Sequence, residues 1–343
     1  MTSVEQAPRP VRSWLLAGMA LIACMVVIGG ITRLTGSGLS ITEWKPIMGA
    51  LPPMDELEWN EAFKKYQAIP EYRLKNHHMD LAGFKQIFFW EYLHRNWGRL
   101  MGLVFIVPFL VFLRRGWLKG WLLRRTLLIL VGGGLVGALG WFMVASGLAD
   151  RPDVSHYRLA IHLCAAFTVY LLVWWTVLDL DHGRRAFVAF GQGAGPVYLA
   201  LALVVLQVIW GAFTAGMDAG RIYNTWPLMN GEWMPDNVLA HGSLWTDLTD
   251  HRDGVQFVHR CLAWLVAGVV VALGWRRMKD AEPEGRWARS MLALVLLQFT
   301  LGVMTLLWQV PLWLGVAHQL GALALLTSVV ALLHCSERPV YKA

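Results

Sequence analysis

Apolar residues run through this chain in long, uninterrupted windows. Windows of about 20 apolar residues recur along its length, which is what an α-helix needs to cross the hydrocarbon core of a bilayer. The predicted spans lie at roughly 13–33, 96–113, 124–145, 158–178, 196–216, 257–275, 289–308 and 312–333. We therefore predict an all-α integral membrane protein with eight transmembrane helices and the lipid bilayer as its solvent.

Short basic segments separate alternate windows. They are RRGWLKGWLLRR (114–125), DHGRR (181–185) and RRMKDAEPEGRWAR (276–289). Because positive loops stay on the cytoplasmic side, we expect these segments and both termini to be cytoplasmic. The two long segments, near 34–93 and 217–255, then lie outside.

Composition agrees with a membrane protein. The chain of 343 residues is 56% hydrophobic and only 15% charged, whereas a soluble domain has about 25% charged residues. Many of its 19 Trp, such as Trp97, Trp117 and Trp275, sit near the ends of apolar windows, where indole rings favour the headgroup region. The net charge of +7 comes from the basic segments between windows, so we do not expect nucleic-acid binding.

The chain also contains an internal repeat. Its matching segments are IGGITRLTGSGLSITEWKPIMG and IWGAFTAGMDAGRIYNTWPLMNG, EYLHRNWGRLMGLV and QFVHRCLAWLVAGV, and YRLAIHL and LGVAHQL. Each half holds four spans, an even number, so both halves enter the membrane from the same side as a parallel repeat. We predict two pseudo-symmetric four-helix bundles, residues 1–190 and 191–343.

Four of the 11 histidines occupy equivalent positions in this repeat. His94, His162, His259 and His318 are expected in the first two turns of the second, fourth, sixth and eighth helices, at the outer face. Within a four-helix bundle, the second and fourth helices can face each other across the core. Two imidazoles so placed can hold one haem iron from both sides.

These histidines also allow other interpretations. A lone intramembrane histidine is often a satisfied core group, but repeating such a costly group at equivalent positions indicates a shared function. Zinc is the rival metal and prefers three or four ligands in one tetrahedron. Two imidazoles per bundle, without a nearby cysteine or acidic pair, favour a planar macrocycle. The absence of a CxxCH motif excludes a covalent c-type haem.

Arginines near the histidines are candidates for binding haem propionates, because guanidinium groups pair with carboxylates in a bidentate manner. The candidate residues are Arg33, Arg95, Arg99, Arg158 and Arg260. Arg95 and Arg260 directly follow a histidine, which favours the propionate role. For Arg33 and Arg99, an interfacial arginine reaching toward headgroups is an equal alternative.

Glu91 differs between the two halves. It lies three residues before His94, so on a continuous helix both side chains share a face. Gln256 occupies the same place before His259 and cannot carry a charge. An enzyme that reacts at one haem and keeps electrons on the other would need this asymmetry. The simpler alternative is that Glu91 pairs with Arg95 or with a loop lysine.

The sequence as a whole resembles the haem A synthase family of proteobacteria and mitochondria. The resemblance rests on GGITRLTGSGLSITEWKPIMGALPP, FKQIFFWEYLHRNWGRLMG, GWFMVASGL with VSHYRLAIHL, NTWPLMNG, QFVHR and TLLWQVPLWLGVAHQ, and covers nearly the whole chain. It implies an oxidoreductase that converts the C8 methyl group of haem O to a formyl group, giving haem A for cytochrome oxidase.

The resemblance also implies residue roles. His259 and His318 would hold a resident haem b, His94 and His162 would hold the substrate haem, and Glu91 matches an essential acidic position. We expect Glu91 to orient or deprotonate a water molecule as a general base. Some members carry a cysteine pair in an external loop; neither long loop here contains a cysteine, so a thiol-dependent mechanism is not expected.

The family context implies a bacterial inner membrane protein that receives haem O from haem O synthase, the protohaem farnesyltransferase. A homo-oligomer is also compatible with it. Two other functions remain as alternatives. A di-haem b-type electron-transfer protein would share the four histidines but would not explain Glu91 opposite Gln256. A transporter would need polar or broken-helix sites near the bilayer midplane, where this chain is apolar.

Overall fold

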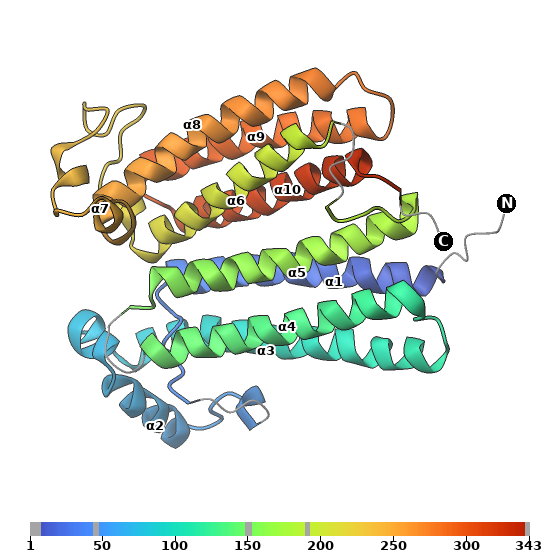
Figure 1. Cartoon of the computed structure of the whole chain (residues 1–343). Coiled ribbons are helices and arrows are strands. Elements are labelled where there is room, and N and C mark those ends of the chain that lie inside the picture. Colours follow the sequence, from blue (N-terminus) through green and yellow to red (C-terminus); the bar gives the residue numbers. More distant parts are fainter. Residues whose placement is uncertain (1–7, 44–47, 148–152, 189–192, 340–343) are drawn as a thin grey trace.

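The computed structural model describes residues 8–43, 48–147, 153–188 and 193–339. Within these ranges the chain forms helices and no β-strand (Figure 1). The long helices are α1 (Arg9–Leu34), α3 (Leu81–Arg114), α4 (Gly120–Gly147), α5 (His156–His182), α6 (Gly195–Gly216), α8 (Arg252–Arg277), α9 (Glu284–Leu307) and α10 (Leu312–Ser336). These 8 helices are long and apolar enough to cross a membrane, which confirms the predicted all-α class and number of spans.

Helix contacts divide the bundle into two rings of four. In the N-terminal half, α1 packs on α3 and α5, and α4 closes the ring against both; in the C-terminal half, α6, α8, α9 and α10 pack in the same cyclic order. The halves meet where α1 and α5 contact α10 and α6 (Figure 1). The expected boundary between residues 190 and 191 lies outside the described residues, and the two-fold relation between the halves stays a prediction.

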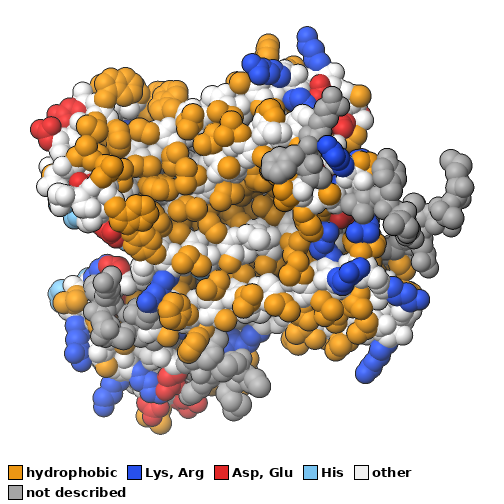
Figure 2. Space-filling view, in the orientation of Figure 1, with side chains coloured by type: hydrophobic (Ala, Val, Ile, Leu, Met, Phe, Trp, Pro, Cys, Tyr) orange, Lys and Arg blue, Asp and Glu red, His pale blue; other side chains and the backbone are white. Residues whose placement is uncertain are grey.

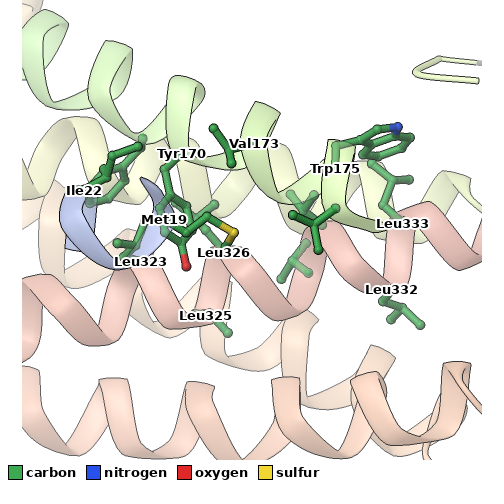
Figure 3. Packing of buried hydrophobic residues seen from close by; sticks show 14 of the residues in the cluster. Met19, Ile22, Tyr170, Val173, Trp175, Leu323, Leu325, Leu326, Leu332 and Leu333 are labelled. Carbon is green, nitrogen blue, oxygen red and sulfur yellow. The ribbon is translucent and has the colours of Figure 1, made fainter. Parts of the chain in front are cut away.

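The largest apolar core follows the seam between the halves. Figure 3 shows Met19 and Ile22 of α1, Tyr170 of α5, and Leu323 and Leu326 of α10 packed together. Lipid is as apolar as these side chains, so their close packing, rather than escape from water, holds the helices together.

The surface of the bundle is apolar across its middle. Figure 2 shows hydrophobic side chains covering the central part of this face, with most charged side chains toward its ends. Leu103, Leu135 and Leu297 are among the exposed large hydrophobic residues. Such a belt is what a membrane-spanning bundle presents to lipid.

The start of α1 and the end of α10 lie at the same end of the bundle (Figure 1). Arg12 binds Asp181 near the end of α5 with an Nε–Oδ1 distance of 2.6 Å, and the backbone N–H of Ala186 donates to the carbonyl of Arg338 at 3.2 Å. The basic α3–α4 and α8–α9 loops share this end. That it faces the cytoplasm remains the prediction from the charge pattern.

Helix α3 begins well before the predicted span at 96. Asp80 caps it by accepting a hydrogen bond from the backbone N–H of Gly83 at 2.8 Å, and its first turns pack through Phe84 and Phe88 against Trp59 of α2 (Glu56–Gln67). The expectation that His94 lies in the first two turns of its helix is therefore wrong. The apolar window marks only the part of α3 inside the membrane, and the helix continues outward under an aromatic cap. His259 likewise lies just beyond the second turn of α8.

A buried polar cluster joins three helices at the end that carries the basic loops. Asp179 of α5 accepts from the backbone N–H of Arg185 at 2.9 Å, lies 3.1 Å from Nε2 of His334 on α10, and pairs with Arg125 of α4 at 3.4 Å. The side chains of Asp179 and His334 are almost completely buried. The Arg125 guanidinium and the hydrogen bonds to Oδ1 offset part of the cost of burying this carboxylate, whose Oδ2 has no hydrogen-bond partner among the described residues.

Replacing Asp179 with leucine should destabilise the protein by roughly 3–5 kcal/mol, because Arg125 would lose the carboxylate that compensates its partly desolvated charge. Thermal or denaturant unfolding of the detergent-solubilised protein measures the change. Asp181→Asn, two residues along, is the matched control: its pair with Arg12 is partly exposed and should contribute only about 0–1 kcal/mol. Equal stability of the two variants would contradict a structural role for the cluster.

Candidate functional site

Each of the four predicted ligand histidines lies against a glycine on a neighbouring helix. The pairs are Gly29–His94, Gly140–His162, Gly211–His259 and Gly302–His318. A Cβ atom added at these glycines would approach an imidazole atom to between 2.8 and 3.3 Å. The missing side chain therefore lets each ring lie directly on a helix backbone, a close approach typical of small residues in membrane interfaces.

The histidines pair across each ring of helices. α3 and α5 each pack on α1 and α4, so they occupy diagonal corners, as α8 and α10 do in the other half. His94 and His162 therefore lie on diagonal helices of one ring, and His259 and His318 on diagonal helices of the other. The four residues are partly exposed although they lie between packed helices.

The donor set fits a haem held by two imidazoles. Across the described ranges, no group of three or more His, Cys, Asp or Glu is placed to hold a metal ion, so a tetrahedral zinc site has no ligand set there. Nδ1 of His162 and Nδ1 of His318 are buried, and these two rings lie beside the backbone of Val136 and Gln298, respectively. Two imidazoles on diagonal helices of each half match the donor set of a haem held by two histidines.

Glu91 is buried, with 3% of its surface exposed, and is surrounded by donors. Its Oε1 accepts from Nε and Nη2 of Arg95 at 3.0 and 2.5 Å, and its Oε2 accepts from Ser40 Oγ and the Ile41 backbone N–H, both at 2.7 Å. A carboxylate has about four lone-pair positions, so all are in use. The simpler expectation that Glu91 pairs with Arg95 is confirmed, and its catalytic role stays a prediction.

The C-terminal half replaces this carboxylate site as a unit. Gln256 is also buried; its Nε2 donates to the Tyr223 carbonyl at 3.3 Å, and its Oε1 has no hydrogen-bond partner in the described part of the chain. Ile222 precedes Tyr223 as Ser40 precedes Ile41. The charge and the hydroxyl group that serves it are therefore both missing beside His259.

Arg95 and Arg260 hold the loops that follow α1 and α6. Nη2 of Arg95 donates to the Ile41 carbonyl at 2.8 Å, and Nη2 of Arg260 donates to the Tyr223 carbonyl at 2.6 Å. These contacts hold the loops after α1 and α6 against α3 and α8, the helices that carry His94 and His259.

The other candidate arginines, on α1, α3 and α5, contact groups other than these loop carbonyls. Arg33 donates to the Ala215 carbonyl at 2.5 Å and so crosses to the other half. Arg99 donates to Asn96 at 2.7 Å, and Arg158 lies 4.5 Å from the ring centroid of Phe142. Propionate binding stays a prediction for all five arginines.

A cavity of about 210 Å³ opens beside Arg95 in the N-terminal half. It lies between the loop after α1 and the outer part of α4, and its lining residues are Ile41, Thr42, Glu43, Arg95, Trp141, Val144 and Ala145. Arg95 and Ile41 both bind Glu91 directly. Water or a substrate substituent in this cavity would therefore lie beside the donors of the carboxylate.

Glu71 is a titratable residue that the sequence analysis did not select. It lies in the segment between α2 and α3, where it accepts a hydrogen bond from the Tyr66 hydroxyl at 3.2 Å. Asn76 donates to the same hydroxyl at 2.7 Å. Burial raises the pKa of Glu71 to about 7, and the nearby charge of Glu91 adds to the increase. The glycines that face the histidines were also missed, although each half places one in its first and third membrane helix.

Comparisons with known proteins agree with this geometry. Residues 12–330 match the family model COX15-CtaA, described as cytochrome oxidase assembly protein. The chain is 46% identical over 337 residues to a protein named heme A synthase from Maricaulis maris, covering 97% of both chains. It is 44% identical over 327 residues to one of the same name from Flavobacterium psychrophilum, covering 94% of this chain and 96% of that one.

These relatives and the eight membrane-spanning helices indicate a multi-pass enzyme of the bacterial inner membrane that acts on haem. The paired histidines, the buried carboxylate in one half and the matches across nearly the whole chain lead to one family. The chain belongs to the cytochrome oxidase assembly family COX15-CtaA, together with proteins named heme A synthase.

Proposed function

We propose that the protein is an oxidoreductase that converts the C8 methyl group of haem O to a formyl group, giving haem A. One observation carries the proposal: the N-terminal histidine pair has a buried carboxylate, Glu91, three residues before His94, whereas the C-terminal pair has the neutral Gln256 at that position. A protein that only transfers electrons between two haems needs no such difference, so the di-haem electron-transfer alternative receives no support from it.

The N-terminal half is the proposed substrate site. His94 and His162 would ligate the iron of haem O, because Glu91 and the cavity beside Arg95 lie in this half. His259 and His318 would hold a resident haem b, which supplies electron-transfer chemistry when bound. Around that second site, Gln256 and Ile222 replace Glu91 and Ser40.

Conversion of the methyl group to the formyl group removes four electrons, which an external electron acceptor must take up. Two leave in forming an alcohol, and two in forming a hydrated aldehyde that releases water to give the formyl group. We propose that Glu91 orients the water that takes part in this chemistry. Arg95 and the Ile41 backbone N–H donate to the carboxylate and hold it in place, while the Ser40 hydroxyl, which can rotate, is the partner that water would replace on Oε2. Deprotonation of that water by Glu91 would follow once Ser40 has turned away.

Haem O carries a long apolar chain, so the substrate would arrive through the membrane. We propose haem O synthase, the protohaem farnesyltransferase, as its source. A homo-oligomer is compatible with the exposed apolar belt, and all five candidate arginines remain proposed propionate contacts.

Glu91→Gln should lower haem A production by roughly 100-fold or more, because general acid–base residues typically contribute factors of about 10²–10⁴. Acid–acetone extraction and chromatography with mass detection, from cells that supply haem O, measure haem A, haem O and haem B. Unchanged haem B in the variant would show that the protein still folds. Gln256→Glu is the matched control and should retain activity; full haem A production by Glu91→Gln would refute the role.

Gly140→Ala should impair the substrate site, because the new Cβ would lie 3.1 Å from Cε1 of His162 and force the ring to move. A displacement of several tenths of an ångström should reduce turnover by roughly tenfold, since about 1 Å can cost 100-fold. Gly137→Ala, one turn earlier on α4, meets nothing within 4 Å and should behave as wild type. Equal haem A production by the two variants would contradict the proposal that the contact between His162 and Gly140 positions the substrate haem.

A further inference from the structure

The second and third membrane helices of each half meet differently. In the C-terminal half, α8 and α9 approach each other closely at many positions, whereas their counterparts α3 and α4 come close at few. Both pairs are neighbours in a ring, and the first helix of each pair carries a ligand histidine, His94 or His259. The N-terminal ring is therefore the more open one on this side.

Three aromatic rings fill the contact between α8 and α9. Trp264 of α8 lies five residues after His259, and Phe299 of α9 lies three residues before Gly302. The centroids of these two rings are 4.8 Å apart. Trp226, in the loop after α6, stacks on Trp264 with a centroid distance of 5.7 Å. Large rings in direct contact leave no passage for another molecule between these two helices.

The equivalent positions of the N-terminal half carry Arg99 and Gly137. Arg99 lies five residues after His94, and its guanidinium donates to Asn96 of its own helix at 2.7 Å. Gly137 lies three residues before Gly140, and a Cβ added to Gly137 would meet no atom within 4 Å in the described part of the chain. Where the C-terminal half places two rings in contact, this half has open space.

The open space adjoins the cavity beside Arg95. Gly137, Trp141 and Val144 are spaced by four and three residues, so they share one face of α4. Trp141 and Val144 line the cavity of about 210 Å³ together with Arg95 of α3. Gly102 lies seven residues after Arg95 on the same face of α3, and a Cβ there would also meet no described atom within 4 Å. The open space beside Gly102 and Gly137, here the α3–α4 gap, therefore extends from the cavity along both helices.

We propose that the α3–α4 gap is the subsite for the long apolar chain of haem O, and that Trp264 and Phe299 exclude such a chain from the C-terminal site. A haem held by His94 and His162 would lie inside the ring of helices, so a long substituent has to leave between two of them. The gap offers this exit one turn from Gly140, the glycine on which His162 rests. The inference rests on the proposed function, since it requires the two histidine pairs to bind different haems.

Steric fit is the basis of this selection. Lipid is as apolar as the chain, so the chain gains little by moving from lipid onto an apolar protein surface. The packed rings of the C-terminal half act against the chain, because inserting extra atoms into a filled contact forces side chains and backbone to move. Haem B lacks the long chain and fits a closed ring of helices, whereas haem O needs an open one.

Gly137→Phe tests the gap by introducing the ring that the C-terminal half has at this position. The purified full-length protein in lipid nanodiscs is titrated with haem O or haem B, and optical and EPR spectra record the low-spin haem that depends on His94. The variant should weaken haem O binding roughly tenfold or more and leave haem B binding nearly unchanged, because only haem O needs the exit. The single methyl group of Gly137→Ala should leave the gap open.

Leu135→Phe is the matched control, because it adds a ring on a different, exposed face of α4 and should bind both haems as wild type does. Unchanged haem O binding in Gly137→Phe would overturn the inference. An equal loss of both haems, with the resident haem retained, would also overturn it, because the new ring would then act on the macrocycle rather than on the chain.

Trp264→Ala combined with Phe299→Gly is the converse test, and it decides the matter if Gly137→Phe folds poorly. Both changes are made in a His94→Ala background, so that the N-terminal pair is incomplete. Protein purified from cells that make haem O should then retain haem O as well as haem B, whereas the His94→Ala parent should retain haem B alone. Acid–acetone extraction with mass detection measures both pigments. Haem B alone in both proteins would refute the exclusion assigned to the two rings.

The wild-type titration separates this inference from the proposed function. If the wild type shows no low-spin haem O signal that His94→Ala removes, the assignment of the substrate site fails and the inference fails with it. If that signal is present and Gly137→Phe binds haem O as wild type does, the substrate site stands and only the role of the α3–α4 gap is refuted.

Discussion

Each of the four imidazole rings lies against the backbone of a neighbouring helix at a glycine, and the rest of the site depends on this contact. Inside the hydrocarbon layer a helix satisfies its own backbone groups, so it can lie close to a neighbour wherever side chains are small. Gly29 and Gly140 provide such surfaces in the N-terminal half. They let the helices of one ring stay packed while the rings of His94 and His162, on diagonal helices, lie directly on the backbones of α1 and α4.

The difference between the halves concerns sets of residues rather than single positions. Glu91 accepts from Ser40, and both have apolar or neutral counterparts, Gln256 and Ile222, in the other half. Arg95 and Arg260, in contrast, keep the same task of holding a loop carbonyl. The contacts that hold the loop after the first helix are thus repeated in both halves, while the buried carboxylate before His94 has a neutral counterpart before His259.

The sequence predicted the membrane helices well because apolar length is a one-dimensional signal. The predicted start of α3 was too late. Asp80 caps the helix and aromatic residues pack it against α2, so α3 extends beyond the apolar window, and hydropathy gives no signal for that part. The repeat identified the four histidines and the contrast between Glu91 and Gln256. It could not identify Ser40 as a partner of Glu91, 51 residues away, because that contact depends on how the loop after α1 folds onto α3. Nor could it identify Gln207 as a neighbour of His259, because that contact depends on which faces of α6 and α8 meet.

Because each imidazole ring rests on the backbone of a neighbouring helix, a change in bilayer thickness should have little effect on that contact. In each half the glycine and the histidine that rests on it belong to packed neighbours, such as α6 and α8. A change in lipid thickness is accommodated by tilting whole helices, and packed neighbours tilt together. The distance between each imidazole and its supporting helix then changes little with membrane thickness, so the four histidines keep their arrangement as the lipids around the protein change.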